Sequence, residues 1–201
     1  MQKKSLFQKL KQIPILGVIL LISNGYAASG EISHFQALSS WSNWYQRIVK
    51  NLVIFFILGA AFSYFSYSEI TSATGFKPEE AILDIFPDIL GFGIGVFALL
   101  FTLPTVFLAR LRRKNSKSKN NNSKFGAHML PVDMAYPLMI YCFIMLIAAM
   151  FRMVPDSPFT IWISCSLLLY GFYMCFELLS SIFNTASLMV AVRKLEDDNQ
   201  E

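Results

Sequence analysis

The sequence predicts an all-α, polytopic membrane protein with four transmembrane helices, arranged as two hairpins behind an N-terminal interfacial helical region. Apolar residues make up 55% of the 201 residues and charged residues 15%, which is too apolar for a soluble domain with one core. If four apolar segments cross, all 17 Lys and Arg residues except Lys77 and Arg152 fall on one side. Basic residues in short loops stay in the cytoplasm. We therefore expect a bacterial inner-membrane protein with both chain ends cytoplasmic.

The first fifty residues are predicted to form an apolar, interfacial segment. Four lysines precede an apolar run from Ile13 to Ile22, and Gly25-Tyr26-Ala27 has small residues spaced as at a signal-peptidase site. Residues 1–27 therefore also fit a cleaved signal peptide. If this run crossed the membrane, however, the basic cluster Arg110 to Lys124 would lie outside, against the positive-inside rule. Ten strongly apolar residues are also too few for a core of about 30 Å, so we favour an uncleaved segment in the interface.

The remaining boundaries follow from where the apolar runs meet charged residues. In the first hairpin, residues 51–109, one span runs from Asn51 to Tyr67 and a second from Asp88 to Leu108, joined by an acidic outside connection. Residues 110–134 form a basic, polar cytoplasmic loop. The second hairpin, residues 135–192, has a span from Ala135 to Arg152, an outside turn, and a span from Phe159 whose apolar pattern reaches Val192. Residues 193–201 form a charged cytoplasmic tail. The last span is longer than one crossing needs.

A pair of glycines in the second span is a candidate helix-packing or pore element. Gly91 and Gly95 are spaced as a small-xxx-small pair, which allows two helix backbones to approach closely in lipid. Pro104 is expected to kink the same span. We favour packing within one chain over self-association around a pore.

Three carboxylates precede these glycines at intervals of four residues. Glu80, Asp84 and Asp88 would share one face of a helix and, in an oligomer, could form rings at an outer mouth that attract cations. The alternative is a solvated first turn that caps the span. We favour the capping interpretation because Pro87 suggests a break between Asp84 and Asp88.

Glu177 is the one carboxylate well inside an apolar run, and an ionisable group there is a functional candidate. Ser180, Ser181 and Asn184 follow at helical spacing and extend a polar stripe toward the cytoplasm. Two interpretations stay open: a wet, functional stripe, or an ion pair with a base such as Arg110 plus interhelical hydrogen bonds.

No enzyme or cofactor signature is present in the sequence. His34 and His128 lack neighbours at metal-ligand spacing, and the three cysteines lie in apolar runs, so we expect no metal, cofactor or catalytic residue. The basic charge lies beside the spans, where lipid headgroups account for it, so nucleic acid is not an expected partner. The expected partners are the lipid bilayer and either further copies of the chain or other membrane subunits.

Two segments carry a resemblance to a known class of proteins. Residues Leu83 to Thr102 (LDIFPDILGFGIGVFALLFT) and Leu169 to Leu195 (LYGFYMCFELLSSIFNTASLMVAVRKL) resemble small bacterial inner-membrane proteins of prophages and phage-defence cassettes. These include lambdoid phage-exclusion channels and retron membrane effectors. The resemblance implies a non-enzymatic, pore-forming or membrane-perturbing effector that depolarises the infected host.

The export-like first thirty residues favour an alternative function. They suggest a structural or assembly subunit of a membrane complex, such as a secretion or conjugation apparatus. A transporter ranks third, because it needs more spans or a dimer.

Overall fold

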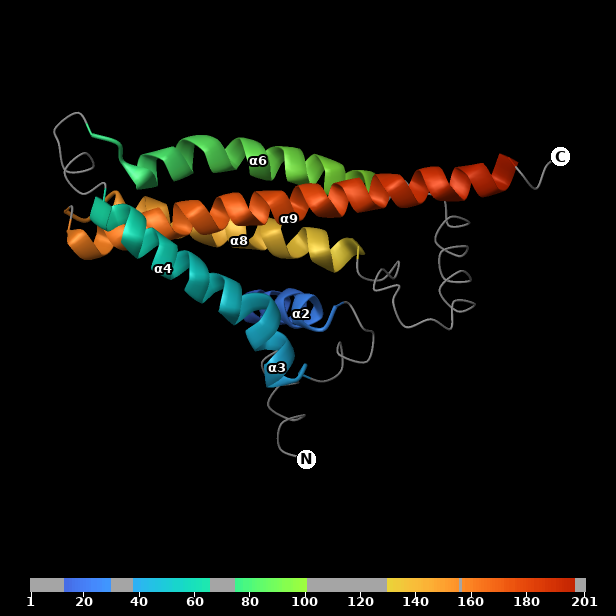
Figure 1. The fold of residues 1–201 in the computed structure, drawn as a ribbon, viewed down its shortest axis with the longest axis horizontal. Helices are drawn as coiled ribbons and strands as arrows, with labels where there is room; N and C mark the ends of the chain where they lie inside the picture. The colour runs from blue at the N-terminus through green and yellow to red at the C-terminus, as the bar shows by residue number, and fades with distance from the viewer. Residues whose placement is uncertain (1–12, 30–37, 66–74, 101–129, 156, 198–201) are drawn as a thin grey trace.

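The chain folds into helices, and four of them are long and apolar enough to cross a membrane. The computed structural model describes residues 13–29, 38–65, 75–100, 130–155 and 157–197, and all regular structure in these ranges is helical. The four candidate spans are Trp41–Phe65, Pro78–Leu99, Pro131–Phe151 and Pro158–Ser187. The prediction of an all-α polytopic membrane protein is thereby confirmed (Figure 1).

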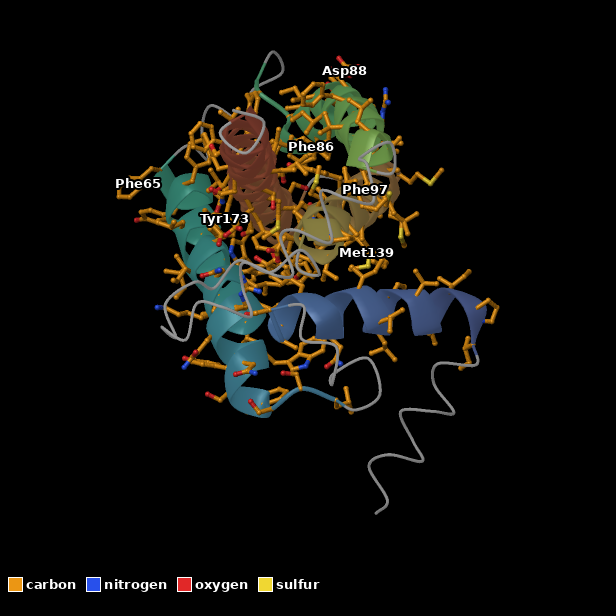
Figure 2. The ribbon with its side chains drawn as sticks, turned by 90° about the vertical axis from the view of Figure 1, so that its right-hand side faces the viewer. Phe65, Phe86, Asp88, Phe97, Met139 and Tyr173 are labelled. Carbon is orange, nitrogen blue, oxygen red and sulfur yellow. The ribbon has the colours of Figure 1, made fainter. Side chains whose placement is uncertain are left out.

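The first described helix, α2 (Pro14–Ala27), lies across the long helices (Figure 2). It has 14 residues, which corresponds to about 21 Å and is less than a membrane crossing requires. Its first turns are exposed and apolar, with Ile15 75% exposed. Its last turns, from Ser23 to Ala27, are buried, and the helix packs against α8.

The first span begins ten residues earlier than the expected Asn51. The segments α3 (Trp41–Trp44), η2 (Tyr45–Val49) and α4 (Lys50–Phe65) follow one another as a continuous helix, with a π-helical turn in the middle. Ser40 caps its start, because its hydroxyl accepts a hydrogen bond from the Asn43 amide at 3.4 Å. No glycine or proline interrupts residues 41–58, so the helix continues through the basic residues at its start.

The second span, α6 (Pro78–Leu100), also begins ten residues before its expected start at Asp88. Pro78 occupies the first helical position, which proline favours, and Glu79 and Glu80 lie in the first turn, where the helix dipole favours acids. Pro87 lies inside the helix and does not end it. The expected break at Pro87 is therefore wrong, because buried Ile82 and Phe86 hold the turn before it against the bundle.

The helices α8 (Leu130–Phe151) and α9 (Pro158–Asp197) form a packed hairpin. The third span was expected near Ala135, but α8 begins at Leu130 and continues through Pro137. Ser157 caps α9, because its hydroxyl accepts from the Thr160 amide at 3.2 Å while its own amide donates to the Thr160 hydroxyl at 2.9 Å.

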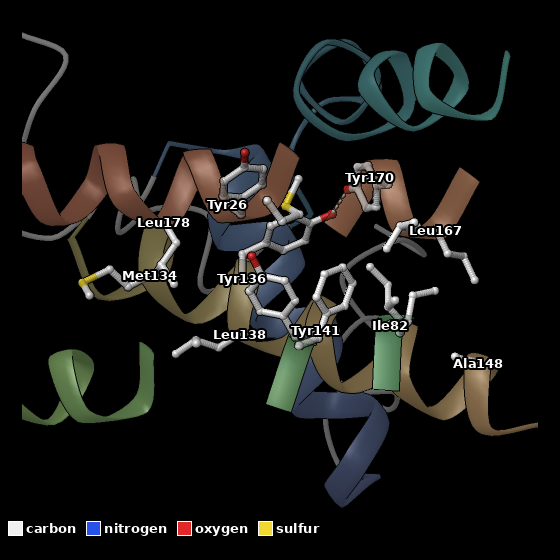
Figure 3. Packing of buried hydrophobic residues seen from close by; sticks show 14 of the residues in the cluster. Tyr26, Ile82, Met134, Tyr136, Leu138, Tyr141, Ala148, Leu167, Tyr170 and Leu178 are labelled. Carbon is white, nitrogen blue, oxygen red and sulfur yellow. Dashed lines mark hydrogen bonds between the residues drawn. The ribbon is translucent and has the colours of Figure 1, made fainter. Parts of the chain in front are cut away.

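The long helix α9 is the common partner of the other spans. It packs against α4, α6 and α8, and α6 also packs against α8. The first two spans, α4 and α6, each pack against α9. Side chains fill the interior between α6, α8 and α9 (Figure 3), and the largest fully buried ones include Ile82, Phe86, Tyr141, Ile144, Met174 and Leu178.

Candidate functional site

The predicted site residues of α6 share one exposed face, which we call the α6 outer face. Its members are Glu80, Asp84, Asp88, Gly91 and Gly95, and all five are exposed. Spacings of four, four, three and four residues place them within one side of an α-helix. Figure 2 shows Asp88 pointing away from the bundle and Phe86 pointing into it. The three carboxylates and the two glycines therefore form one continuous row on the same side of α6.

The glycine pair does not serve packing between the described helices of one chain. A Cβ built on Gly91 or Gly95 has no atom within 4 Å, so the favoured interpretation of packing within the chain is wrong for the described residues. The packing glycine of α6 is Gly93 instead, on the opposite side of the helix. A Cβ on Gly93 would overlap Leu138 and approach Leu178 to 3.1 Å. Pro104 and Arg110 lie outside the described residues.

A second candidate region lies where α2, η2, α4, α8 and α9 meet. We call it the interhelical polar cluster, and it consists of Tyr26, Arg47, Asn51, Asp133, Tyr136, Tyr170, Tyr173 and Glu177. Most of these side chains are buried or half-buried, so hydrogen bonds and charge interactions within the protein have to stabilise their polar atoms.

Arg47 joins three elements within this cluster. Its guanidinium donates to the backbone carbonyl of Tyr26 at 2.6 Å and lies 4.8 Å from the centre of the Tyr26 ring. It also lies 3.7 Å from Asp133, whose side chain is 16% exposed. The Tyr26 carbonyl also accepts from the Ser29 amide at 3.2 Å, so Arg47 adds a second hydrogen bond there, and its positive charge matches the helix dipole at the end of α2. Arg47 sits in the π-helical turn, a distortion that often marks functional positions.

Asn24 fixes the end of α2 from the other direction. Its side-chain oxygen accepts from the Ser39 amide at 2.8 Å and from the Trp44 indole at 3.4 Å. The segment from Ser39 to Arg47 therefore holds α2 by both hydrogen bonds and charge.

Three tyrosines extend the cluster from α2 toward the buried interior between the helices. The Tyr26 ring stacks on Tyr136 with centroids 4.0 Å apart, and the Tyr136 and Tyr170 hydroxyls lie 3.4 Å apart (Figure 3). Burial raises the pKa of Tyr26 far above its usual value, and the charge of Glu177 raises it further. Tyr26 therefore stays a neutral phenol against the bundle.

Tyr173 links α4 to Glu177. The Asn51 amide donates to the Tyr173 hydroxyl at 2.8 Å, and that hydroxyl donates to Glu177 at 2.6 Å. Of the stripe that follows, Ser181 and Asn184 are half-buried and Ser180 is exposed. The link from Glu177 to α4 thus runs through Tyr173 on the same helix as Glu177, which the sequence analysis did not predict.

Removing the Tyr173 hydroxyl tests this link. Tyr173→Phe deletes the donor to the half-buried Glu177 carboxylate and one of the two acceptors of the Asn51 amide, so we expect a loss of about 1–3 kcal/mol in the free energy of unfolding. Chemical or thermal unfolding in detergent measures it. Glu177→Gln is the control, because its amide oxygen still accepts the bond. A Tyr173→Phe protein as stable as the Glu177→Gln protein would contradict the role of the hydroxyl.

Sequence reasoning missed the Arg47–Asp133 pair because it placed Arg47 in an interfacial segment and Asp133 in a loop. The signal that could have found it is the topology itself: both residues immediately precede a span on the same predicted side of the membrane. Opposite charges at the same depth of neighbouring helices are expected to pair.

The α6 outer face and the interhelical polar cluster both consist of side chains suited to helix contact, hydrogen bonding and charge interactions. Within the described ranges no group of three or more His, Cys, Asp and Glu side chains is placed to hold a metal ion. Comparison of the chain with family models, with curated proteins and with solved structures finds no match.

Proposed function

We propose that this protein is a non-enzymatic membrane effector that self-associates through the α6 outer face and permeabilises the bilayer. The proposal places it in the inner membrane of a bacterium, with both chain ends and residues 110–124 on the cytoplasmic side. Its biological setting is that of a phage-defence or abortive-infection effector. The carrying observation is the exposed, unpacked Gly91/Gly95 pair beneath a row of exposed carboxylates.

The filled interior of the single chain supports assembly as the route to a pore. The space between α6, α8 and α9 holds closely packed side chains such as Phe86, Tyr141 and Met174. A water path through the membrane would therefore run between chains. The α6 outer face is suited to this because it carries glycines for close approach and carboxylates at one end for cations.

The glycine pair also argues against a face that only meets lipid. Apolar bulk suits lipid contact, as on α4, where Ile57 and Phe65 are 65% and 82% exposed. Two glycines at the same face instead leave helix backbone without side chains over it, which a second helix can approach closely.

A large side chain in place of either glycine should weaken the activity. We expect induction of the protein in bacteria to collapse the membrane potential, and Gly95→Leu to slow the collapse about tenfold, the effect of losing ~1.4 kcal/mol of contact free energy. A potential-sensitive dye measures the rate. Because no atom lies within 4 Å of a Cβ at position 95, the variant should keep its own fold.

The matched control is Ala61→Leu, which adds similar bulk to an exposed position of α4. Induction without any change in potential would remove the proposal. A fixed protein partner that co-purifies without depolarisation would instead favour the alternative function, a subunit of a secretion or conjugation apparatus.

A further inference from the structure

The first turns of α2 have an exposed surface that is entirely apolar. Ile15 is 75% exposed and Val18 55%, and Ile13 and Leu16 are exposed as well. No charged residue occurs between Ile13 and Ala27. The polar side chains of the helix lie in its last turns, where they are buried: Ser23, Asn24 and Tyr26. A helix that rests on a membrane surface turns charged and polar residues toward water, so α2 is not a helix of that kind.

The packing of α2 on α8 sets its depth in the membrane. The Tyr26 ring stacks on Tyr136 with centroids 4.0 Å apart. Tyr136 lies sixteen residues before Arg152, the exposed charged residue that follows the span, and is therefore about 24 Å from it along the helix. The hydrocarbon core of a bilayer is about 30 Å thick. The end of α2 therefore lies inside the hydrocarbon, about 6 Å from the edge opposite Arg152.

A second span gives nearly the same depth. Arg47, which donates to the Tyr26 carbonyl at 2.6 Å, lies eighteen residues before Phe65, or about 27 Å along the helix. Figure 2 shows α2 lying across the long helices, so its other turns stay close to this level. Its backbone hydrogen bonds lie within the helix, which allows it to be surrounded by lipid.

We infer that α2 lies in the plane of the membrane within one leaflet, with lipid acyl chains packed around its first turns. Acyl chains match an exposed surface of branched apolar side chains at this depth. The sequence just before α2 also favours lipid over a protein partner, because its charge complements the anionic headgroups above that leaflet. Its basic residues are Lys3, Lys4, Lys9 and Lys11.

This placement gives the single chain an effect on the bilayer that does not depend on self-association. A helix of 14 residues, about 21 Å long and 10 Å wide, takes up area in the leaflet that contains it. It is too short to take up the same area in the other leaflet. The helix α2 therefore acts as a wedge that expands one leaflet relative to the other.

Depth-dependent fluorescence quenching tests this placement in the full chain. Ile15→Cys and Ile19→Cys are labelled with bimane in a Cys142→Ser, Cys175→Ser background, in which the remaining cysteine, Cys165, is buried. The proteins are reconstituted into vesicles of phosphatidylcholine and phosphatidylglycerol. Nitroxides on the upper acyl chain should quench both labels, and iodide in the water should not. The two depths should agree within about 2 Å, whereas a helix along the membrane normal would separate them by about 6 Å.

Two further positions calibrate the measurement, and three outcomes contradict the inference. Ile57→Cys, 65% exposed in α4, marks the deep hydrocarbon, and Met153→Cys, 88% exposed after α8, marks water. Iodide quenching of Ile15→Cys equal to that of Met153→Cys would place α2 in water. A depth difference of about 6 Å would turn it across the membrane, and quenching by neither reagent would mean that protein covers it. Each of these results overturns the inference, and none depends on whether the protein depolarises cells.

Discussion

Gly59→Leu is expected to separate α4 from α9 and to destabilise the protein by about 3 kcal/mol. A Cβ at position 59 would overlap the Ser166 hydroxyl and lie 2.5 Å from the Ser166 Cα, so the obstacle is backbone that cannot rotate away. Among the described helices, α4 packs mainly on α9, so this contact is its main support. A change of this size corresponds to a fall in Tm of roughly 10 °C for a chain of this length.

The fluorescence of Trp162 reports this separation locally. Its indole donates to the Phe56 carbonyl at 3.0 Å, one turn from Gly59. We expect a red-shifted emission and earlier thermal unfolding in detergent for Gly59→Leu. Ala61→Leu adds the same side chain two residues later on an exposed side and should change neither. Equal behaviour of the two variants would show that the Gly59–Ser166 contact is unimportant.

Arg47→Met should release α2 from the bundle. The substitution keeps much of the apolar stem but removes the donor to the Tyr26 carbonyl and the charge beside Asp133. Leaving a largely buried carboxylate without its cation costs 3–5 kcal/mol in full burial, and the side chain of Arg47 is 33% exposed, so we expect about 2 kcal/mol. Hydrogen exchange should rise over residues 14–27 and little elsewhere.

Adding Asp133→Leu to Arg47→Met tests whether the loss of stability comes from the uncompensated charge or from the changed side-chain shape. In the Arg47→Met, Asp133→Leu protein both members of the ion pair are gone, so much of the lost stability should return. Lys50→Met removes an exposed cation one turn later and is the control. If the double variant is no more stable than Arg47→Met alone, the ion pair is not the source of the loss.

The sequence was sufficient for the fold class because lipid imposes a simple rule on composition. Every apolar run long enough to cross corresponds to a helix, and α2 is too short to cross, as the length of the Ile13 to Ile22 run predicts. The helix starts were misplaced because charges and prolines were taken as boundaries. Ser40 and Pro78 instead begin helices well before the apolar runs, and tertiary packing carries α6 through Pro87.

Side-chain partners were harder to predict than helices. Spacing placed Glu80, Asp84, Asp88, Gly91 and Gly95 on one side of α6, but only the packing of Leu138 and Leu178 against Gly93 shows which side faces inward. The Arg47–Asp133 pair depends on how α2, η2 and α8 meet, which no local sequence pattern shows. Glu177 was singled out by its place in an apolar run, but its partner Tyr173 looked like one more aromatic residue of that run.

The central place of α9 has a consequence for how the protein is made. The ribosome releases α4 and α6 into the membrane before α9 exists, so both helices must wait in lipid without the surface they pack against. The short turn before Pro158 lets α8 and α9 enter together. Assembly is therefore completed from the last segment translated, and the early helices are the ones most open to quality-control proteases until it arrives.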